Sequence, residues 1–279
     1  MAYGLTLEEV RHINRPQPVP EAWGTTTSLT AMPRFSMFRI DLLPGAAQPL
    51  HLVPGVAFHA FVESGDAVLR HLDSNAHSHA GLVRAGQVFA LQPSLVHGWA
   101  SASGASLYLF SARLAEDLHP IAMETQEAAS LIFPALELAA LPQLGQPTTD
   151  VREKYWGRIE TIASGEEMAA KRIFVRKGGQ SSLEYHVEKS ESYYIHSGLL
   201  KLGLRIGRAE NRSIVMSAGH SYDVRPGVMH MRIGLEDTVI LEISTRDSDA
   251  DSYLVEDGQT YRHIDVDSPP LNPKQEQFA

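Results

Sequence analysis

Short apolar stretches alternate with turn residues along much of the chain. Residues 171–176 (Lys-Arg-Ile-Phe-Val-Arg) are β-prone and run into a Gly-Gly pair, and residues 191–196 (Glu-Ser-Tyr-Tyr-Ile-His) end at Ser197-Gly198. Residues 199–206 and 238–244 continue this pattern. Short β-prone segments spaced about 8–12 residues apart are typical of a sandwich or a barrel. The pattern therefore predicts an all-β chain.

Helix is predicted only at the margins of this pattern. Thr6-x-x-Glu9 has the spacing of a capping box and predicts a short helix in an N-terminal arm, residues 1–14. Residues 121–132 predict a second helix, which runs into a linker over residues 126–147. Residues 266–279 are polar and proline-rich, so we expect them to form a C-terminal tail.

The chain also matches itself at a shift of 133 residues, without a gap. The matched positions are rich in turn-forming and aromatic residues: Trp23-Gly24 with Trp156-Gly157, Arg39-Ile40 with Arg172-Ile173, Ser64-Gly65 with Ser197-Gly198, Ala85-Gly86 with Ala218-Gly219, Pro93 with Pro226, and His97 with His230. This single shift predicts two copies of one β domain, residues 15–125 and 148–265.

The amino-acid composition and the charge of the chain exclude several classes of function. The 279 residues carry 24 Lys plus Arg against 33 Asp plus Glu, a net charge of −9, and contain no Cys. An acidic chain without a basic stripe is a poor candidate for nucleic-acid binding. No run of about 18 apolar residues predicts a membrane span. The N-terminal residues lack a signal-peptide pattern, so a cytoplasmic location is the default expectation.

The absence of thiolates leaves His, Asp and Glu as the ligands for any transition metal. Glu184 and His186 are two apart on a β-prone segment, so their side chains share a face. A tight turn would bring Glu191 to the same interior, and His230 follows the Pro226-Gly227 turn. Two imidazoles and two carboxylates make a plausible divalent-metal site in the second copy.

These residues fall in a pattern that resembles the two signature motifs of the cupin superfamily. The first is Gly-x5-Glu-x-His-x4-Glu-x6-Gly, from Gly178 to Gly198, and the second is Pro226-Gly-x2-His230. The resemblance implies two tandem cupin barrels, of the double-stranded β-helix or jelly-roll type, with minor helices. It also implies a metal ion on Glu184, His186, Glu191 and His230.

Residues 150–260 resemble more closely the cupin domain of type II mannose-6-phosphate isomerases, including those fused to mannose-1-phosphate guanylyltransferase. The segments that carry this likeness are Tyr155-Trp156-Gly157, Lys171-Arg172-Ile173, Ser182–His186, Lys189–Gly198, Arg225–His230, Leu241–Thr245 and Glu256-Asp257. The resemblance implies aldose–ketose isomerisation of a sugar or sugar phosphate on one divalent ion: Zn, Mn, Fe, Ni or Co. One departure is Glu184, which stands where those isomerases usually have Gln.

Several further side chains are candidates for this chemistry. Glu184 is the first candidate for the catalytic base, and Lys171 is the second candidate for polarising a substrate oxygen or moving a proton. Arg172 and Arg232 are candidates for a substrate phosphate, because guanidinium groups match phosphate oxygens. Strand alternation allows only one of Lys171 and Arg172 to point inward. Tyr193 and Tyr222 are expected to line the pocket or to belong to the barrel core.

The first copy keeps the turn residues but not the ligand set. At the shift of 133 residues, His51 matches Glu184, Val53 matches His186, Phe58 matches Glu191, and His97 matches His230. Two ligands of four rarely hold a metal tightly, so the first copy is expected to be a degenerate barrel and the second the metal-binding one.

Two other functions fit the same residues. A mononuclear non-haem Fe(II) dioxygenase of the cupin class uses a similar ligand shell with positions open for oxygen. A non-catalytic sugar-binding cupin would need no base near the metal. The expected partner is a small-molecule carbohydrate, and a homodimer is the default oligomeric state for this type of barrel.

Overall fold

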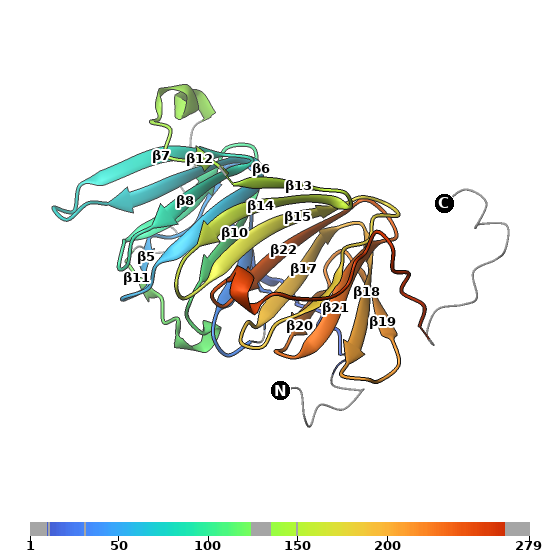
Figure 1. Cartoon of the computed structure of the whole chain (residues 1–279). Helices are drawn as coiled ribbons and strands as arrows, with labels where there is room; N and C mark the ends of the chain where they lie inside the picture. Colours follow the sequence, from blue (N-terminus) through green and yellow to red (C-terminus); the bar gives the residue numbers. More distant parts are fainter. Residues whose placement is uncertain (1–9, 11, 31, 124–134, 149, 266–279) are drawn as a thin grey trace.

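The computed structural model describes residues 10, 12–30, 32–123, 135–148 and 150–265. Two curled antiparallel β units stand side by side in Figure 1, the first in blue and cyan and the second in yellow and orange. No helix of the described residues is long and apolar enough to cross a membrane.

The first unit is one branched sheet in which the central path runs β1-β2-β3-β10-β6-β9-β5-β11. The long strand β6 bends through the unit and also pairs with β7 and β8. Its strands are β1 (Val19–Glu21), β2 (Gly24–Ser28), β3 (Ser36–Leu42), β4 (Ala46–Ala47), β5 (His51–Leu52), β6 (Phe58–Leu72), β7 (Ser78–Arg84), β8 (Gln87–Leu91), β9 (His97–Ser101), β10 (Ala105–Ser111), β11 (Ile121–Ala122) and β12 (Gln146–Pro147).

The second unit consists of two sheets with the orders β13-β14-β15-β22-β17-β20 and β19-β18-β21-β16-β23. Its strands are β13 (Val151–Lys154), β14 (Gly157–Ser164), β15 (Ala169–Val175), β16 (Leu183–Tyr185), β17 (Glu191–Ser197), β18 (Leu199–Ile206), β19 (Arg212–Ser217), β20 (Ser221–Val224), β21 (Val228–Gly234), β22 (Thr238–Ser244) and β23 (Tyr253–Glu256).

The predicted repeat is confirmed strand by strand. β3 and β15 begin and end 133 residues apart, as do β10 and β22. The register repeats as well, since Leu42 pairs with Ala105 and Val175 pairs with Thr238. The repeated Trp-Gly pair has a steric cause: a Cβ at Gly157 would overlap the carbonyl oxygen of Phe174, and one at Gly24 would overlap that of Asp41.

Each barrel has its own core, and a third core lies between them. Trp23 packs inside the first barrel and Trp156 inside the second. The third cluster mixes residues of both copies, for example Phe61 and Tyr108 with Tyr194 and Leu241. Tyr194 and Tyr108 are in ring contact at 6.0 Å between centroids. Burial of apolar area on both sides therefore ties the two barrels together.

The N-terminal arm crosses to the second barrel. Val10 is buried in the core of that barrel, and its carbonyl oxygen accepts a hydrogen bond of 2.6 Å from the Tyr222 hydroxyl. Asn14 forms a β-bridge with Ser221. The predicted capping-box helix at Thr6 lies outside the described residues.

The helix predicted over residues 121–132 is wrong at its start. Ile121–Ala122 form strand β11 and pair with β5, and residues 124–134 lie outside the described residues. A 3-10 helix, η2, follows over Ala135–Ala140, and β12 then pairs with β8. The segment predicted as linker therefore adds an edge strand to the first sheet. The exact domain limits stay a prediction.

Candidate metal centre and its pocket

Three strands of the second barrel carry the predicted ligands. Glu184 on β16 and His230 on β21 are direct partners across the sheet, so both side chains lie on one face. His186 follows the end of β16, and Glu191 begins β17. Because Glu191 pairs with Val224 and with Ser244, its side chain is fixed between two neighbouring strands.

The four side chains meet inside the barrel. Among the described residues, the group of potential ligands whose atoms all lie within 4.8 Å of one another is Glu184, His186 and His230. Glu191 touches two of these three: its Oε1 lies 3.5 Å from His186 Nε2, and its Oε2 lies 3.1 Å from His230 Nε2. His230 is fully buried and Glu191 is 2% exposed.

Backbone carbonyls set the tautomers of both imidazoles. His186 Nδ1 lies 2.8 Å from the carbonyl oxygen of Asp251, and His230 Nδ1 lies 3.1 Å from that of Val228. A carbonyl oxygen only accepts, so each Nδ1 carries a proton, and Nε2 of each ring faces Glu191. Nε2 of His230 is buried and makes no hydrogen bond within the described residues.

This arrangement fits a metal ion. Two imidazole lone pairs and a carboxylate repel one another unless a cation or a proton lies between them. A hydrogen bond from the second ring nitrogen to a carbonyl group is the usual support for a metal-binding His. The residues present therefore suit a divalent ion held by nitrogen and carboxylate ligands.

Burial and neighbouring charges shift the pKa values of these residues in opposite directions. Burial lowers the pKa of His186, but the hydrogen bond and charge of Glu191 outweigh it, so the net shift is upward. Burial raises the pKa of Glu191, but Lys189 and the two histidines hold it well below its usual range. Burial likewise opposes ionisation of Glu184, and the charge of Arg232 overcomes it and lowers the pKa. Both carboxylates are therefore ionised at neutral pH.

A pocket of about 260 Å³ opens beside these residues. Three buried cations line it: Lys171 from β15, Lys189 from the turn before β17, and Arg232 from β21. Glu242 of β22 lies between all three, 3.4 Å from Lys171, 3.6 Å from Lys189 and 3.6 Å from Arg232. The inner wall of the pocket is thus a compact network of opposite charges.

Further ion pairs complete this network. Arg232 donates a 2.7 Å hydrogen bond to Glu184 and lies over the rings of Trp156 and Tyr193. Lys189 Nζ lies 2.6 Å from Glu191 Oε1. Burial disfavours the charged form of Lys189, but Glu191 and its other carboxylate neighbours outweigh this and raise its pKa. Lys189 is therefore a cation and a hydrogen-bond donor.

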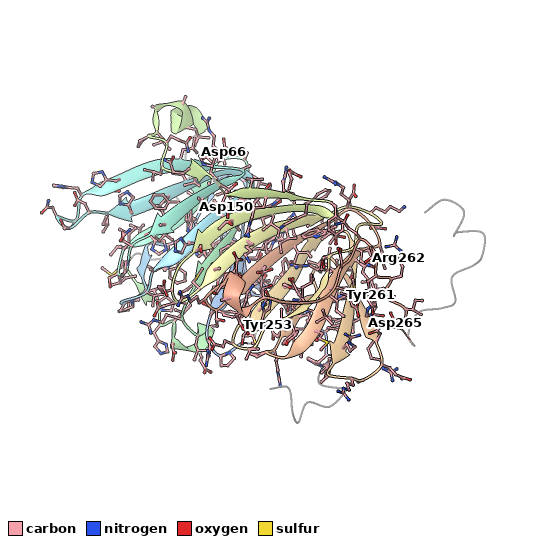
Figure 2. All side chains as sticks on the ribbon, viewed as in Figure 1. Asp66, Asp150, Tyr253, Tyr261, Arg262 and Asp265 are labelled. Carbon is pink, nitrogen blue, oxygen red and sulfur yellow. The ribbon has the colours of Figure 1, made fainter. Side chains whose placement is uncertain are left out.

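Residues 247–252, here called the strap, close one side of the pocket. The carboxylate of Asp251 accepts hydrogen bonds from the backbone N–H groups of Val187, Glu188 and Lys189, at 2.8–3.2 Å. The carbonyl of the same residue orients His186. After the strap, β23 pairs with β16, and Tyr253 stacks on Tyr185 at 5.0 Å. Figure 2 labels Tyr253, Tyr261 and Asp265 along this C-terminal segment beside the second barrel.

Of the predicted site residues, Glu184, His186, Glu191, His230, Lys171 and Arg232 come together around this pocket. Arg172 does not. It points from the opposite face of β15 towards the first barrel, where it makes a bidentate pair with Glu63 at 2.8–2.9 Å. Alternation along β15 decides this, because Lys171 faces inward. The structure therefore does not support a substrate role for Arg172.

The two predicted tyrosines are core residues rather than pocket-lining ones. Tyr193 is fully buried and donates a 2.9 Å hydrogen bond to Glu191 Oε2, so it supports a ligand and does not line the pocket. Tyr222 packs in the barrel core and bonds to Val10. The hydroxyl groups of both residues are occupied by these partners.

Sequence reasoning missed Lys189, Glu242 and the strap residues Asp247 and Asp251. Glu242 had a signal: it is a lone charge inside the apolar run 238–244. Lys189 lies between two predicted ligands and had a weaker signal. Asp247 and Asp251 lie in a polar stretch that reads as an ordinary surface loop, so nothing in the sequence distinguished them.

The first barrel retains a pair of histidines at the equivalent place. His51 and His97 are partners across β5 and β9, with ring centroids 4.6 Å apart, as Glu184 and His230 are partners in the second barrel. The buried Val53 and Phe58 replace the other two ligands with apolar side chains. The described part of the first barrel contains no group of three potential ligands as close as those of the second.

Three comparisons with known proteins differ in what they find. No family model matches the chain. A curated relative, mannose-1-phosphate guanylyltransferase 2 of Escherichia coli O157:H7, is 28% identical over 115 residues, which is 39% of this chain and only 22% of that protein. The link to type II mannose-6-phosphate isomerases therefore stays a prediction.

Solved structures of similar fold include oxalate decarboxylases. The Bacillus subtilis structure at pH 4.6 is 19% identical, with a TM-score of 0.66 over 83% of this chain and 74% of that one. The formate complex of the Lactobacillus farciminis protein is 18% identical, with a TM-score of 0.66 over 86% of each chain. At these identities the likeness concerns the fold: the chain is built of two tandem cupin barrels, as the sequence motifs predicted.

Proposed function

We propose that the second barrel is a metal-dependent catalytic centre for a small, oxygen-rich substrate. The observation that carries this proposal is the convergence of two Nδ1-anchored imidazoles on the ionised Glu191, beside a pocket lined by buried cations. His186, Glu191 and His230 are the residues that would hold the ion, with Glu184 as a fourth ligand unless it acts as the base described below. A bound divalent ion supplies a Lewis acid for carbonyl and hydroxyl oxygens.

The reaction class that the surrounding groups support is proton transfer between neighbouring carbons, as in aldose–ketose isomerisation. Glu184 is ionised and has 24% of its side chain exposed, so it can accept the proton that leaves C2. Lys171 lines the same pocket and can donate a hydrogen bond to the oxygen that gains negative charge in the enediolate. The proton returns from Glu184 to C1, and the hydroxyl proton of O2 passes to O1. The C1 carbonyl thereby becomes a hydroxyl group, the C2 hydroxyl becomes a carbonyl group, and no proton is gained or lost overall.

A second candidate is an oxygen-dependent or decarboxylating reaction on a small acid. The pairing of one carboxylate, Asp247, with both Lys171 and Lys189 supports it, because a substrate carboxylate would find the same partners. The comparisons lend it more support than they lend the isomerase, since the solved structures of similar fold are named for oxalate decarboxylase.

The test combines two assays on the same metal-loaded protein. Aldoses, ketoses, their phosphates and sugar acids would be incubated in deuterated water with Mn, Fe(II), Co, Ni or Zn, and exchange of the C2 proton followed by NMR. Oxygen uptake and carbon dioxide release with oxalate and related acids would be followed in parallel. The His230→Ala protein is the control for activity that does not need the centre.

The outcomes separate the candidates. Metal-dependent C2 exchange supports the isomerase. Oxygen uptake or carbon dioxide release without exchange replaces it by the second candidate. Binding of sugars without any turnover leaves a sugar-binding module and overturns the catalytic proposal.

A further inference from the structure

Asp247 bridges two buried lysines in the wall of the pocket. Its Oδ2 lies 2.6 Å from Lys171 Nζ, and its Oδ1 lies 2.7 Å from Lys189 Nζ. Lys171 is 8% exposed and Lys189 is 4% exposed, whereas the side chain of Asp247 is 28% exposed. One carboxylate thus uses both oxygens on two ammonium groups whose access to water is limited.

We propose that Lys171 and Lys189 form a subsite for an oxyanion group of the substrate, and that Asp247 is a built-in carboxylate that occupies this subsite until the substrate displaces it. Which carbon of that substrate reacts depends on the function proposed above. The binding of the anion does not depend on it.

The arrangement of the other carboxylates identifies Asp247 as the group that leaves. Glu242 and Glu191 also contact these lysines, but both belong to strands of the barrel and are almost fully buried. Asp247 lies beyond the end of β22, at the start of the strap, and its oxygens face the pocket. A buried ammonium needs an anionic partner, so Asp247 can leave only when another oxyanion takes its place.

The charge balance favours an anionic guest. Among the residues of the inner network, the carboxylates are Glu184, Glu191, Glu242 and Asp247, and the cations are Lys171, Lys189 and Arg232. A divalent ion on the ligand set turns this small excess of negative charge into an excess of positive charge. A substrate anion that takes the place of Asp247 beside Lys171 and Lys189 keeps both ammonium groups paired with a negative charge.

Distances also limit the kind of substrate. Lys189 Nζ contacts both Asp247 and the ligand Glu191, so oxygens of the two carboxylates are at most roughly 5 Å apart. An oxyanion in place of Asp247 would therefore lie only a few bonds from an oxygen bound at the ligand set. The substrate class is a small hydroxy or oxo compound with its carboxylate or phosphate close to the reacting carbonyl group.

The experiment measures anion binding to the purified, metal-loaded protein by calorimetry, with inorganic phosphate and acetate as the probes. Asp247→Asn removes the competing charge, and Asp249→Asn removes the same charge from an exposed strap residue that lines the same pocket. We expect Asp247→Asn to bind at least one probe about tenfold more tightly than wild type. Asp249→Asn should change the affinity by less than about threefold. The probe that gains more identifies the guest as a carboxylate or a phosphate.

Lys171→Gln provides the second measurement and does not depend on the folding of the Asp247 variant. It should weaken binding of the same probe relative to wild type, and in the Asp247→Asn background it should abolish the gain. The proposed subsite would be overturned if Asp247→Asn and Asp249→Asn raised the affinity for the probe equally. It would also be overturned if Asp247→Asn did not raise this affinity while Lys171 is present. If the anion binds as expected but no substrate turns over, the subsite stands and only the proposed reaction fails.

Discussion

The chemistry of the centre depends on which atom of each imidazole carries the proton. Two carbonyl groups fix Nδ1–H of His186 and His230, and Glu191 faces both Nε2 atoms and accepts a hydrogen bond from the hydroxyl of Tyr193. The contact of His186 with Asp251 joins two separate turns, whereas those of His230 with Val228 and of Tyr193 with Glu191 each lie within one strand. The ligands are buried, so removal of one of them leaves the charges and lone pairs of the others without a partner.

The first prediction concerns metal content. His186→Ala and His230→Ala should each lose the tightly bound ion, because each removes an anchored nitrogen ligand. His97→Ala, the matched change in the first barrel, should keep it. Elemental analysis of the three purified proteins checks this, and a wild-type content near one ion per chain is expected. Undiminished metal in His186→Ala would contradict the assignment, and two ions per chain would show that the first barrel also binds.

The second prediction concerns pH. Burial, followed by the neighbouring His51, lowers the pKa of His97 to about 4, whereas the unfolded chain protonates this residue near its ordinary value of about 6.5. Between these pH values the unfolded state binds more protons than the folded state, so stability falls as the pH falls. This single group accounts for about 3 kcal/mol over that range.

Urea unfolding at pH 7 and at pH 4.5 measures this effect. His97→Gln should lose less stability between the two pH values than wild type does, by about 2–3 kcal/mol. His77→Gln, a matched change at an exposed position, should behave as wild type. An unchanged pH dependence in His97→Gln would mean that this histidine is not the group responsible.

At the scale of strands, the sequence was sufficient for most of the second barrel. The period of two predicted a shared face for Glu184 and His186, the Pro226-Gly227 turn pointed to His230 as a further candidate ligand, and alternation allowed only one of Lys171 and Arg172 inside. It did not decide which of these two, because the direction of a strand face depends on the partner sheet. Glu242 and Asp247 reach the site through pairing over long sequence separations, which local pattern does not encode.

The third prediction tests the strap as the support of the metal-binding turn. Asp251→Ala removes the acceptor for three consecutive N–H groups between His186 and Glu191. The turn should lose its fixed geometry, and the dissociation constant of the metal should rise about 10–100-fold. Competition with a chromophoric chelator measures it, with Asp249→Ala as the control. Equal affinity in both variants would mean that the turn holds its shape without Asp251.

At the scale of the molecule, the two barrels share an apolar core and a polar contact. Arg172 extends from the second barrel to Glu63 of the first, whose side chain is only 8% exposed. His196 Nδ1 contacts the Tyr108 hydroxyl at 2.7 Å across the same boundary. These contacts make the position of one barrel relative to the other part of the folded structure.

The fourth prediction follows from this contact. Arg172→Ala leaves Glu63 largely buried without its main partner and should destabilise the protein by about 2–3 kcal/mol in urea unfolding. Metal content and phosphate affinity should stay at the wild-type values, because Arg172 lies outside the pocket. A loss of phosphate binding with little loss of stability would instead restore the substrate role predicted from sequence.

The two barrels have the same strand register, so a metal site like that of the second barrel could be engineered into the first. His51 and His97 already occupy two ligand positions, so Val53→His and Phe58→Glu would rebuild the full set at the same backbone sites. Both positions are buried, and without an ion the new polar groups would weaken the barrel. Such an engineered chain would bind two ions, and a chelator would lower the stability of its N-terminal barrel but not that of the same barrel in the native protein.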